Sequence, residues 1–137
     1  MEKEVCLVTG ASSGLGKALA ELLCEKGHKV YVVARRENLL KQLKRDCEKF
    51  EGKIILIPGD LTDIKFREKI ISTIIEKEKR IDYLFNNAGF GKATLLENQD
   101  SEIIKNMLEV NVNSYVHLAS MALKYMKKEN KGRIINT

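Results

Sequence analysis

The chain begins with a short apolar run that leads into a glycine-rich turn, Val5-Cys6-Leu7-Val8-Thr9-Gly10-Ala11-Ser12-Ser13-Gly14-Leu15-Gly16. The apolar run predicts a strand, and from Leu15 to Leu23 the apolar residues recur at helical spacing. A glycine turn between a strand and a helix can present backbone N–H groups and the positive end of the helix dipole to a phosphate. An ordinary tight turn would also explain the glycines, so they do not decide the function alone.

Each glycine of this turn has a specific predicted task. Gly10 permits the turn, Gly14 lets a phosphate approach the backbone, and Gly16 lets the helix pack closely on the sheet. The predicted phosphate site consists of Gly10, Ser12, Ser13, Gly14, Leu15 and Gly16.

Strands and helices alternate along the rest of the chain. After a first helix that ends at Gly27, the patterns predict strands over 30–34, 54–57, 81–86 and 133–137, helices over 39–50, 66–75 and 101–128, a charged connector over 76–80 and a loop over 88–97. This order is typical of a parallel sheet with helices on both faces. We therefore predict one domain over 1–137, a Rossmann-like doubly wound α/β fold whose ligand crevice lies beyond the carboxyl ends of the strands.

Length and composition exclude several classes of protein. The chain has 137 residues, 44% of them apolar and 31% charged, with one proline, which fits one folded domain rather than a disordered chain. The net charge of +5 favours anionic ligands without requiring nucleic acid. Neither a signal peptide nor a membrane-spanning run is visible, so we expect a cytoplasmic protein.

Cysteine and histidine offer no metal site. Cys6, Cys24 and Cys47 are odd in number and widely spaced, which favours reduced packing residues over disulfides or zinc ligands. His28 and His117 have no second ligand at metal-binding spacing and are predicted to be structural. The basic residues near the carboxyl end have one interleaved aromatic residue, which favours a solvated helix end over a nucleic-acid surface.

Residues 9–16, Thr-Gly-x-x-x-Gly-x-Gly, resemble the cofactor motif of the short-chain dehydrogenase/reductase family. Three later motifs are similar to that family in order and spacing: Gly59-Asp60-Leu61-Thr62-Asp63, Asn86-Asn87-Ala88-Gly89 and Val110-Asn111-Val112. The resemblance implies that Asp60 and Leu61 meet adenine and that Asn86, Ala88 and Gly89 line the cofactor ribose and steady the sheet. It also implies that Asn111 is the catalytic asparagine, whose backbone carbonyl holds a water in the proton relay.

Each of these motifs has a structural alternative. Asp60 could cap the following turn, and the paired asparagines could form a polar turn. Asn111 interrupts an apolar stripe, where an unpaired buried amide costs about 1–3 kcal/mol. A functional or kink-stabilising role is therefore favoured for Asn111.

The residues after the second predicted strand indicate the cofactor. An acid there would bind the 2′-hydroxyl of NAD, and an arginine would accept the 2′-phosphate of NADP. This chain has Ala34-Arg35-Arg36 and no acid, so NADP is predicted over NAD, with Arg35 the first candidate, Arg36 the second and Ser12 a supporting hydroxyl. A solvated turn is the alternative for the two arginines. The missing acid also weakens a methyltransferase interpretation.

The family's catalytic serine and Tyr-x-x-x-Lys would follow the fifth strand, and no tyrosine of this chain has lysine four residues later. We therefore expect a truncated chain that is inactive alone and acts on a small carbonyl or alcohol only if a catalytic half is supplied. An exposed edge strand and an unpartnered helix face would then favour self-association as a homo-oligomer. Two hypotheses remain: an NADP-dependent oxidoreductase, or a non-catalytic nucleotide-binding fragment or interaction module.

Overall fold

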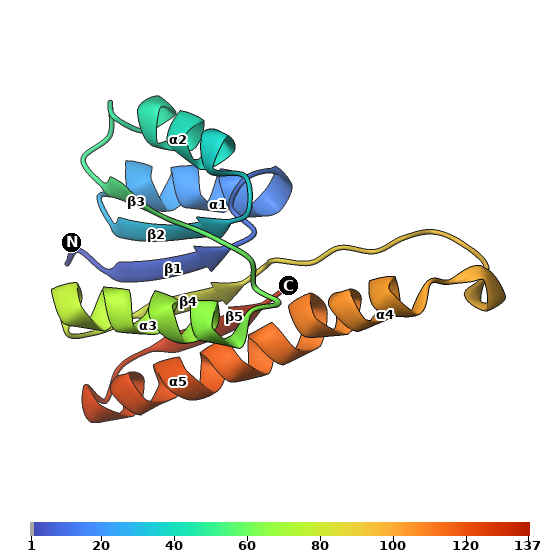
Figure 1. Cartoon of the computed structure of the whole chain (residues 1–137). Coiled ribbons are helices and arrows are strands. Elements are labelled where there is room, and N and C mark those ends of the chain that lie inside the picture. Colours follow the sequence, from blue (N-terminus) through green and yellow to red (C-terminus); the bar gives the residue numbers. More distant parts are fainter. Residues whose placement is uncertain (1) are drawn as a thin grey trace.

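The fold is built around one parallel sheet. The computed structural model describes residues 2–137. Its five strands lie in the order β3-β2-β1-β4-β5 (Figure 1). They are β1 (Val5–Thr9), β2 (Lys29–Ala34), β3 (Lys53–Pro58), β4 (Tyr83–Asn86) and β5 (Arg133–Asn136). The predicted Rossmann-like parallel arrangement is confirmed.

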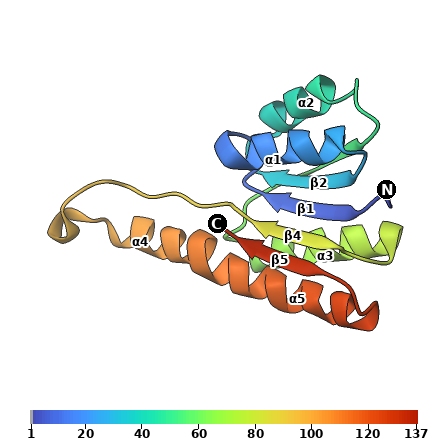
Figure 2. The ribbon, with the colours of Figure 1, turned by 180° about the vertical axis from the view of Figure 1, so that it is seen from behind.

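Helices cover both faces of the sheet. The helices α1 (Gly14–Glu25) and α2 (Glu37–Asp46) lie on one face, and α3 (Ile64–Glu78) and α5 (Ser114–Lys128) lie on the other (Figures 1 and 2). The central strand β1 is buried along its whole length between these layers. Val5 and Leu7 belong to the core under α3 and α5, whereas Cys6 and Val8 belong to the core under α1 and α2. Burial on both faces explains the continuous apolar run.

The strand order reverses at β1. Leu7 of β1 pairs with Tyr31 of β2 on one side and with Leu84 of β4 on the other. The connections therefore lead away from β1 in both directions, and this divergence opens a crevice beyond the carboxyl ends of β1 and β4. The glycine turn follows β1, and the paired asparagines end β4, so both motifs meet at this crevice.

Two predicted helix ends were wrong. The second helix ends at Asp46 and not at Phe50, which packs against the core from the turn that follows. The third helix runs through the predicted charged connector to Glu78. Glu78 accepts hydrogen bonds from Lys29 Nζ and Tyr31 Oη, each at 2.8 Å. Its charge is therefore used in tertiary contacts with β2, which favour a longer helix.

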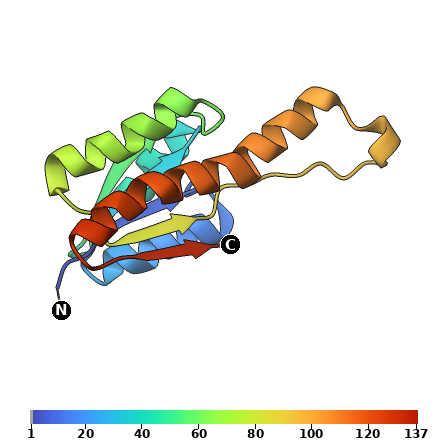
Figure 3. The same ribbon diagram turned by 90° about the horizontal axis from the view of Figure 1, so that it is seen from below.

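The long helix predicted over 101–128 is continuous but not uniform. It consists of α4 (Ser101–Leu108), the π-helical segment η2 (Glu109–Asn113) and α5. Figure 3 shows α4 projecting beyond the sheet, together with the preceding loop that contains the short 3₁₀ helix η1 (Leu96–Asn98). A π turn inside an α-helix frequently marks a functional position. Here Asn111 lies at its centre.

Candidate functional site

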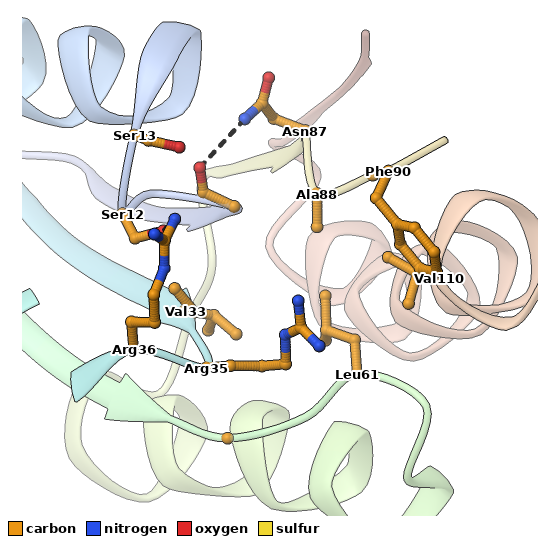
Figure 4. A pocket seen from close by; sticks show the side chains of 14 residues that line it. Ser12, Ser13, Val33, Arg35, Arg36, Leu61, Asn87, Ala88, Phe90 and Val110 are labelled. Carbon is orange, nitrogen blue, oxygen red and sulfur yellow. Dashed lines mark hydrogen bonds between the residues drawn. The ribbon is translucent and has the colours of Figure 1, made fainter. Parts of the chain in front are cut away.

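A cavity of about 260 Å³ lies at the carboxyl ends of the strands, where the strand order reverses (Figure 4). It is lined by Gly10, Ser12, Ser13, Val33, Ala34, Arg35, Arg36, Gly59, Leu61, Asn87, Ala88, Gly89, Phe90 and Val110. Eight of the residues predicted from the sequence are brought together here. Gly14, Leu15, Gly16, Asp60, Asn86 and Asn111 lie beside the cavity or behind its walls and do not line it.

The glycine turn is held tightly against the end of β4. Gly10 has φ +67°, and a Cβ atom there would lie 2.8 Å from Ala88 Cα. A Cβ atom at Gly16 would overlap the Gly10 carbonyl oxygen and would lie 2.5 Å from Asn87 Nδ2. Gly16 thus allows α1 to approach the turn after β1 and the Asn87 amide that follows β4.

The amino-terminal end of α1 is open. Ser13 is its N-cap but makes no side-chain capping bond, and the first turn has no acidic residue. Gly14 has φ +55°, and a Cβ atom there would have no neighbour within 4 Å. Uncapped N–H groups beside free space are a suitable receptor for an anion. Leu15, which is 63% exposed, leaves this end accessible.

Two arginines follow β2 at the rim of the cavity. Both Arg35 and Arg36 are exposed, and within residues 2–137 neither is in an ion pair. Arg36 donates to Ser12 Oγ at 3.4 Å. In Figure 4 the Arg36 side chain extends toward Ser12, whereas Arg35 points toward Leu61. The two cations therefore lie at the rim without a carboxylate to neutralise them.

Asp60 and Leu61 have different surroundings. Asp60 is exposed, and its Oδ1 accepts from Thr62 N at 2.9 Å, which is the turn-capping alternative considered above. Leu61 is buried and lines the cavity. Leu61 and Val110, the latter in the π-helical segment, form an apolar wall of the cavity.

The paired asparagines have separate tasks. Asn86 is fully buried behind the cavity, and its Nδ2 donates to the Tyr115 carbonyl and to Asn136 Oδ1. Asn87 lines the cavity, and its Nδ2 donates to the Thr9 carbonyl at 3.2 Å and the Gly10 carbonyl at 3.4 Å. Asn86 therefore joins β4 to α5 and β5, and Asn87 holds the glycine turn.

Sequence reasoning quoted Asn87 within its motif but did not name it as a site residue. Thr9 was also missed, although it is buried and its Oγ1 accepts from the backbone N–H groups of Asn87 and Ala88, each at 3.0 Å. A polar residue that ends a wholly buried strand was the available signal. Val33, Gly59, Phe90 and Val110 carried no comparable signal because their contribution is shape alone.

Asn111 fixes the loop that carries Gly89. Its side-chain amide pairs with the backbone of Phe90 in both directions, and a Cβ atom on Gly89 would lie 3.1 Å from Asn111 Oδ1. Tyr115, one helical turn later, donates from its hydroxyl to the Ala88 carbonyl at 2.7 Å. Burial raises the pKa of Tyr115 above its ordinary value of 10.0. Both contacts stabilise the 88–90 segment at the cavity mouth.

The cysteines and histidines lie away from this cavity. The three cysteines are buried and free, and burial raises the pKa of Cys6 and of Cys47 to about 12. His28 Nδ1 accepts from Glu4 N at 3.1 Å, and His117 Nδ1 accepts from Arg67 Nε at 3.0 Å. Within residues 2–137, no cluster of three His, Cys, Asp or Glu side chains is arranged to hold a metal ion.

A parallel sheet of this order, with a glycine turn and an open helix end at its switch point, defines an α/β domain of the Rossmann type. The sequence profile of the short chain dehydrogenase family matches residues 4–137. The chain belongs to this family. Across residues 2–137, no helix combines the length and apolar character that a bilayer crossing requires.

Proteins of known name and structure are similar over nearly the whole chain. A 3-ketodihydrosphingosine reductase of Bacteroides thetaiotaomicron is 34% identical over 99% of this chain and 47% of its own length. A 3-oxoacyl-[acyl-carrier-protein] reductase of Vibrio cholerae is 37% identical over 99% of this chain and 54% of its own length. The chain therefore spans about half the length of these relatives.

Solved structures show the same relationship. The bulky-bulky ketone specific alcohol dehydrogenase from Comamonas testosteroni superimposes with a TM-score of 0.91 at 30% identity, covering 99% of this chain and 55% of the other. The L-sorbose reductase from Gluconobacter frateurii, complexed with NADPH and L-sorbose, has a TM-score of 0.93 at 27% identity. That match covers 99% of this chain and 52% of the reductase.

Proposed function

We propose that this chain forms the cofactor-binding part of an NADP-dependent oxidoreductase that interconverts a carbonyl and an alcohol. The observation that carries the proposal is that one cavity holds both an uncapped helix end and two arginines that lack an ion-pair partner among residues 2–137. The L-sorbose reductase complexed with NADPH supports the choice of cofactor. NADPH, when bound, supplies the hydride.

The residues present fit this dinucleotide. The N–H groups at the start of α1 and the open space beside Gly14 suit the pyrophosphate. Arg35 and Arg36 suit the 2′-phosphate, since charge-assisted bonds from guanidinium groups to phosphate are strong and directional. The contact between Arg36 and Ser12 orders one of these cations before any ligand arrives.

The adenine and the nicotinamide ribose are assigned in the same way. Adenine packs against Leu61, with Asp60 beside it, and the nicotinamide ribose lies along Asn86, Ala88 and Gly89, of which Asn86 supports from behind. Asn111 fixes the 88–90 segment through Phe90, and its backbone carbonyl orients a water of the proton relay. A small carbonyl or alcohol is the substrate of the whole protein.

A comparison of the binding affinities of two cofactors tests the proposal. The chain is titrated with NADPH and with NADH while the fluorescence of the reduced nicotinamide is followed. We expect tighter binding of NADPH, and Arg35→Ala and Arg36→Ala each to weaken NADPH by about ten- to a hundredfold, because each removes a charge-assisted bond of roughly 1.5–3 kcal/mol. NADH affinity should barely change.

Arg45→Ala provides the matched control. Arg45 is an exposed arginine in the last turn of α2, and among residues 2–137 its NH2 donates only to Gln42 Oε1. This variant should bind both cofactors like the wild-type chain. Equal losses for NADPH and NADH in the Arg35 and Arg36 variants would contradict the assignment of NADP. A non-catalytic nucleotide-binding module would use the same cavity, so that alternative is separated by measuring activity after a family-type carboxyl half is added.

A further inference from the structure

Arg67 is a buried cation that the proposed chemistry does not use. It lies in the first turns of α3 and is 3% exposed. Its guanidinium reaches three different segments. NH1 donates to the Leu61 carbonyl at 2.8 Å and to Glu109 Oε2 at 3.2 Å, and Nε donates to His117 Nδ1 at 3.0 Å.

Two of the three acceptors, Leu61 and Glu109, lie on opposite sides of one end of the cavity. Leu61 itself lines the cavity, and Glu109 precedes Val110, which lines it from the other side. Arg67 thus connects the loop after β3 with the π-helical segment η2 through one planar group. A guanidinium holds its donors in a fixed fork, so it sets the distance and direction between the groups it binds.

The same contact reaches the residue at the centre of η2. Glu109 accepts from Arg67 on one oxygen and from Asn113 Nδ2 on the other, at 2.7 Å. These bonds span the five residues that contain Asn111, whose side chain pairs with the Phe90 backbone. Holding Glu109 in place therefore holds the π turn between its first and last residues.

Stability alone does not explain a charge at this place. The surrounding interface of α3 and α5 is apolar, with Ile70, Ile74 and Leu118 in the core. Replacing a buried ion pair by apolar side chains of similar volume is often neutral or stabilising, so burying a cation here needs another reason. Orientation of the segments that it joins is such a reason.

We infer that Arg67 is a positioning residue, which sets the Leu61–Val110 end of the cofactor cavity and holds the π turn so that Asn111 engages the 88–90 segment. The inference rests on the proposed function for the identity of the cofactor. Its second half, the coupling from Arg67 to Asn111, concerns the protein without any ligand. The two halves are therefore measured separately.

The first measurement uses hydrogen exchange in the free chain. The Phe90 N–H donates to Asn111 Oδ1, so its exchange rate reports on that side chain. Arg67→Met, which keeps an apolar stem of similar length, should raise the Phe90 exchange rate by about fivefold or more. It should not change exchange in β1. Unchanged Phe90 exchange in a folded Arg67→Met variant would overturn the inference.

The second measurement is NADPH affinity. Arg67→Met should weaken NADPH by about tenfold, within the range that contiguous couplings reach, although Arg67 does not line the cavity. Arg67→Lys should recover only part of this loss because an ammonium cannot hold three acceptors in one plane. Full recovery by lysine would show that charge alone matters and would overturn the positioning role. Unchanged NADPH affinity in the folded methionine variant would overturn the first half of the inference.

Arg80→Met is the matched control. Arg80 also binds three acceptors, Asp82, Glu2 and the Lys3 carbonyl, but at the amino-terminal ends of the strands. It should leave Phe90 exchange and NADPH affinity unchanged. If Arg67→Met does not fold, Glu109→Gln carries both measurements, with the same expected directions, since Glu109 lies at the surface end of the contact.

These outcomes separate the inference from the proposed function. A wild-type chain that does not bind NADPH, with Phe90 exchange still faster in Arg67→Met, would refute the cofactor and retain the link from Arg67 to Asn111. A wild-type chain that binds NADPH, with neither readout changed in Arg67→Met, would retain the cofactor and refute the inference.

Discussion

Asn111 and Phe90 pair as two backbone segments would. Asn111 Nδ2 donates to the Phe90 carbonyl at 2.8 Å, and the Phe90 N–H donates to Asn111 Oδ1 at 3.0 Å. The amide of one side chain thus satisfies both polar groups of a residue in an exposed loop. This pair joins the π-helical segment to the mouth of the cavity, which Phe90 lines.

Asn111→Ala should loosen the 88–90 segment without unfolding the domain. Two exposed hydrogen bonds are lost, so the free energy of unfolding should fall by about 1 kcal/mol, and Phe90 amide exchange should rise about fivefold. The control is Asn106→Ala on α4, because Asn106 makes no side-chain hydrogen bond within residues 2–137. Exchange at Phe90 that matches the wild type in both variants would show that the pair does not hold the loop.

Gly14→Val should abolish NADPH binding and leave the domain folded. A side chain at Gly14 meets no protein atom within 4 Å, and the left-handed backbone there costs a β-branched residue about 1–2 kcal/mol. The new methyl groups occupy the space assigned to the pyrophosphate. Circular dichroism and an NADPH titration on the same sample check this.

Two other glycines serve as comparisons for Gly14→Val. Gly91 also has open space around it but lies outside the cavity lining, so Gly91→Val should bind NADPH normally. Gly16→Val should fail to fold because its side chain would overlap the Gly10 carbonyl. Retained NADPH affinity in folded Gly14→Val would place the phosphates elsewhere.

Glu109 should make stability depend on pH below 4.5. Hydrogen bonds from Asn113 and then from Arg67 hold the pKa of Glu109 below its ordinary value of 4.5. A carboxylate with a lowered folded pKa contributes stability above its unfolded pKa and loses it as the pH falls through the folded value. The stability difference between the wild type and Glu109→Gln should therefore shrink as the pH falls from 5 to about 3.

Denaturant unfolding at each pH measures this difference. Glu97→Gln is the control because Glu97, in η1, makes no ion pair within residues 2–137. Its stability should follow the wild type at every pH. A constant difference between the wild type and Glu109→Gln across this range would show that Glu109 does not titrate as its contacts require.

The local patterns were sufficient for the sheet and for most of the cavity. A strand buried on both faces must be apolar throughout, and a helix on the surface of the sheet must show one apolar stripe. The spacing of apolar residues was therefore enough to locate β1, β2 and α1. Because parallel strands end at one edge, the motifs after β1, β2 and β4 had to meet there. That geometry places eight predicted residues around one cavity.

Contacts between distant residues could not be predicted in this way. Arg67 lies beside the apolar stripe of α3, and from the sequence alone a charged residue there is expected to be exposed. Its partners Glu109 and His117 lie 42 and 50 positions later in the chain. Asn86 and Asn87 bind different partners because their side chains point to different sides at the end of β4. The π turn at Asn111 leaves no mark on the apolar spacing, because one helix continues on either side.

The purified 137-residue chain should reduce no carbonyl compound with NADPH. The Tyr115 hydroxyl contacts a residue that lines the cavity: it donates to the Ala88 carbonyl, and burial raises its pKa. Tyr31 donates to Glu78, which also accepts from Lys29 at the start of β2. Neither of these two hydroxyls is therefore placed to act as the general acid, and removing members of a cooperative catalytic unit costs many orders of magnitude. NADPH oxidation at 340 nm with a panel of ketones and aldehydes measures the outcome.

Activity that appears only after a family-type carboxyl half with serine and Tyr-x-x-x-Lys is added would agree with the proposed oxidoreductase. Absence of activity after this addition would favour the non-catalytic module. Turnover by the chain alone, lost in Asn111→Ala, would contradict the prediction.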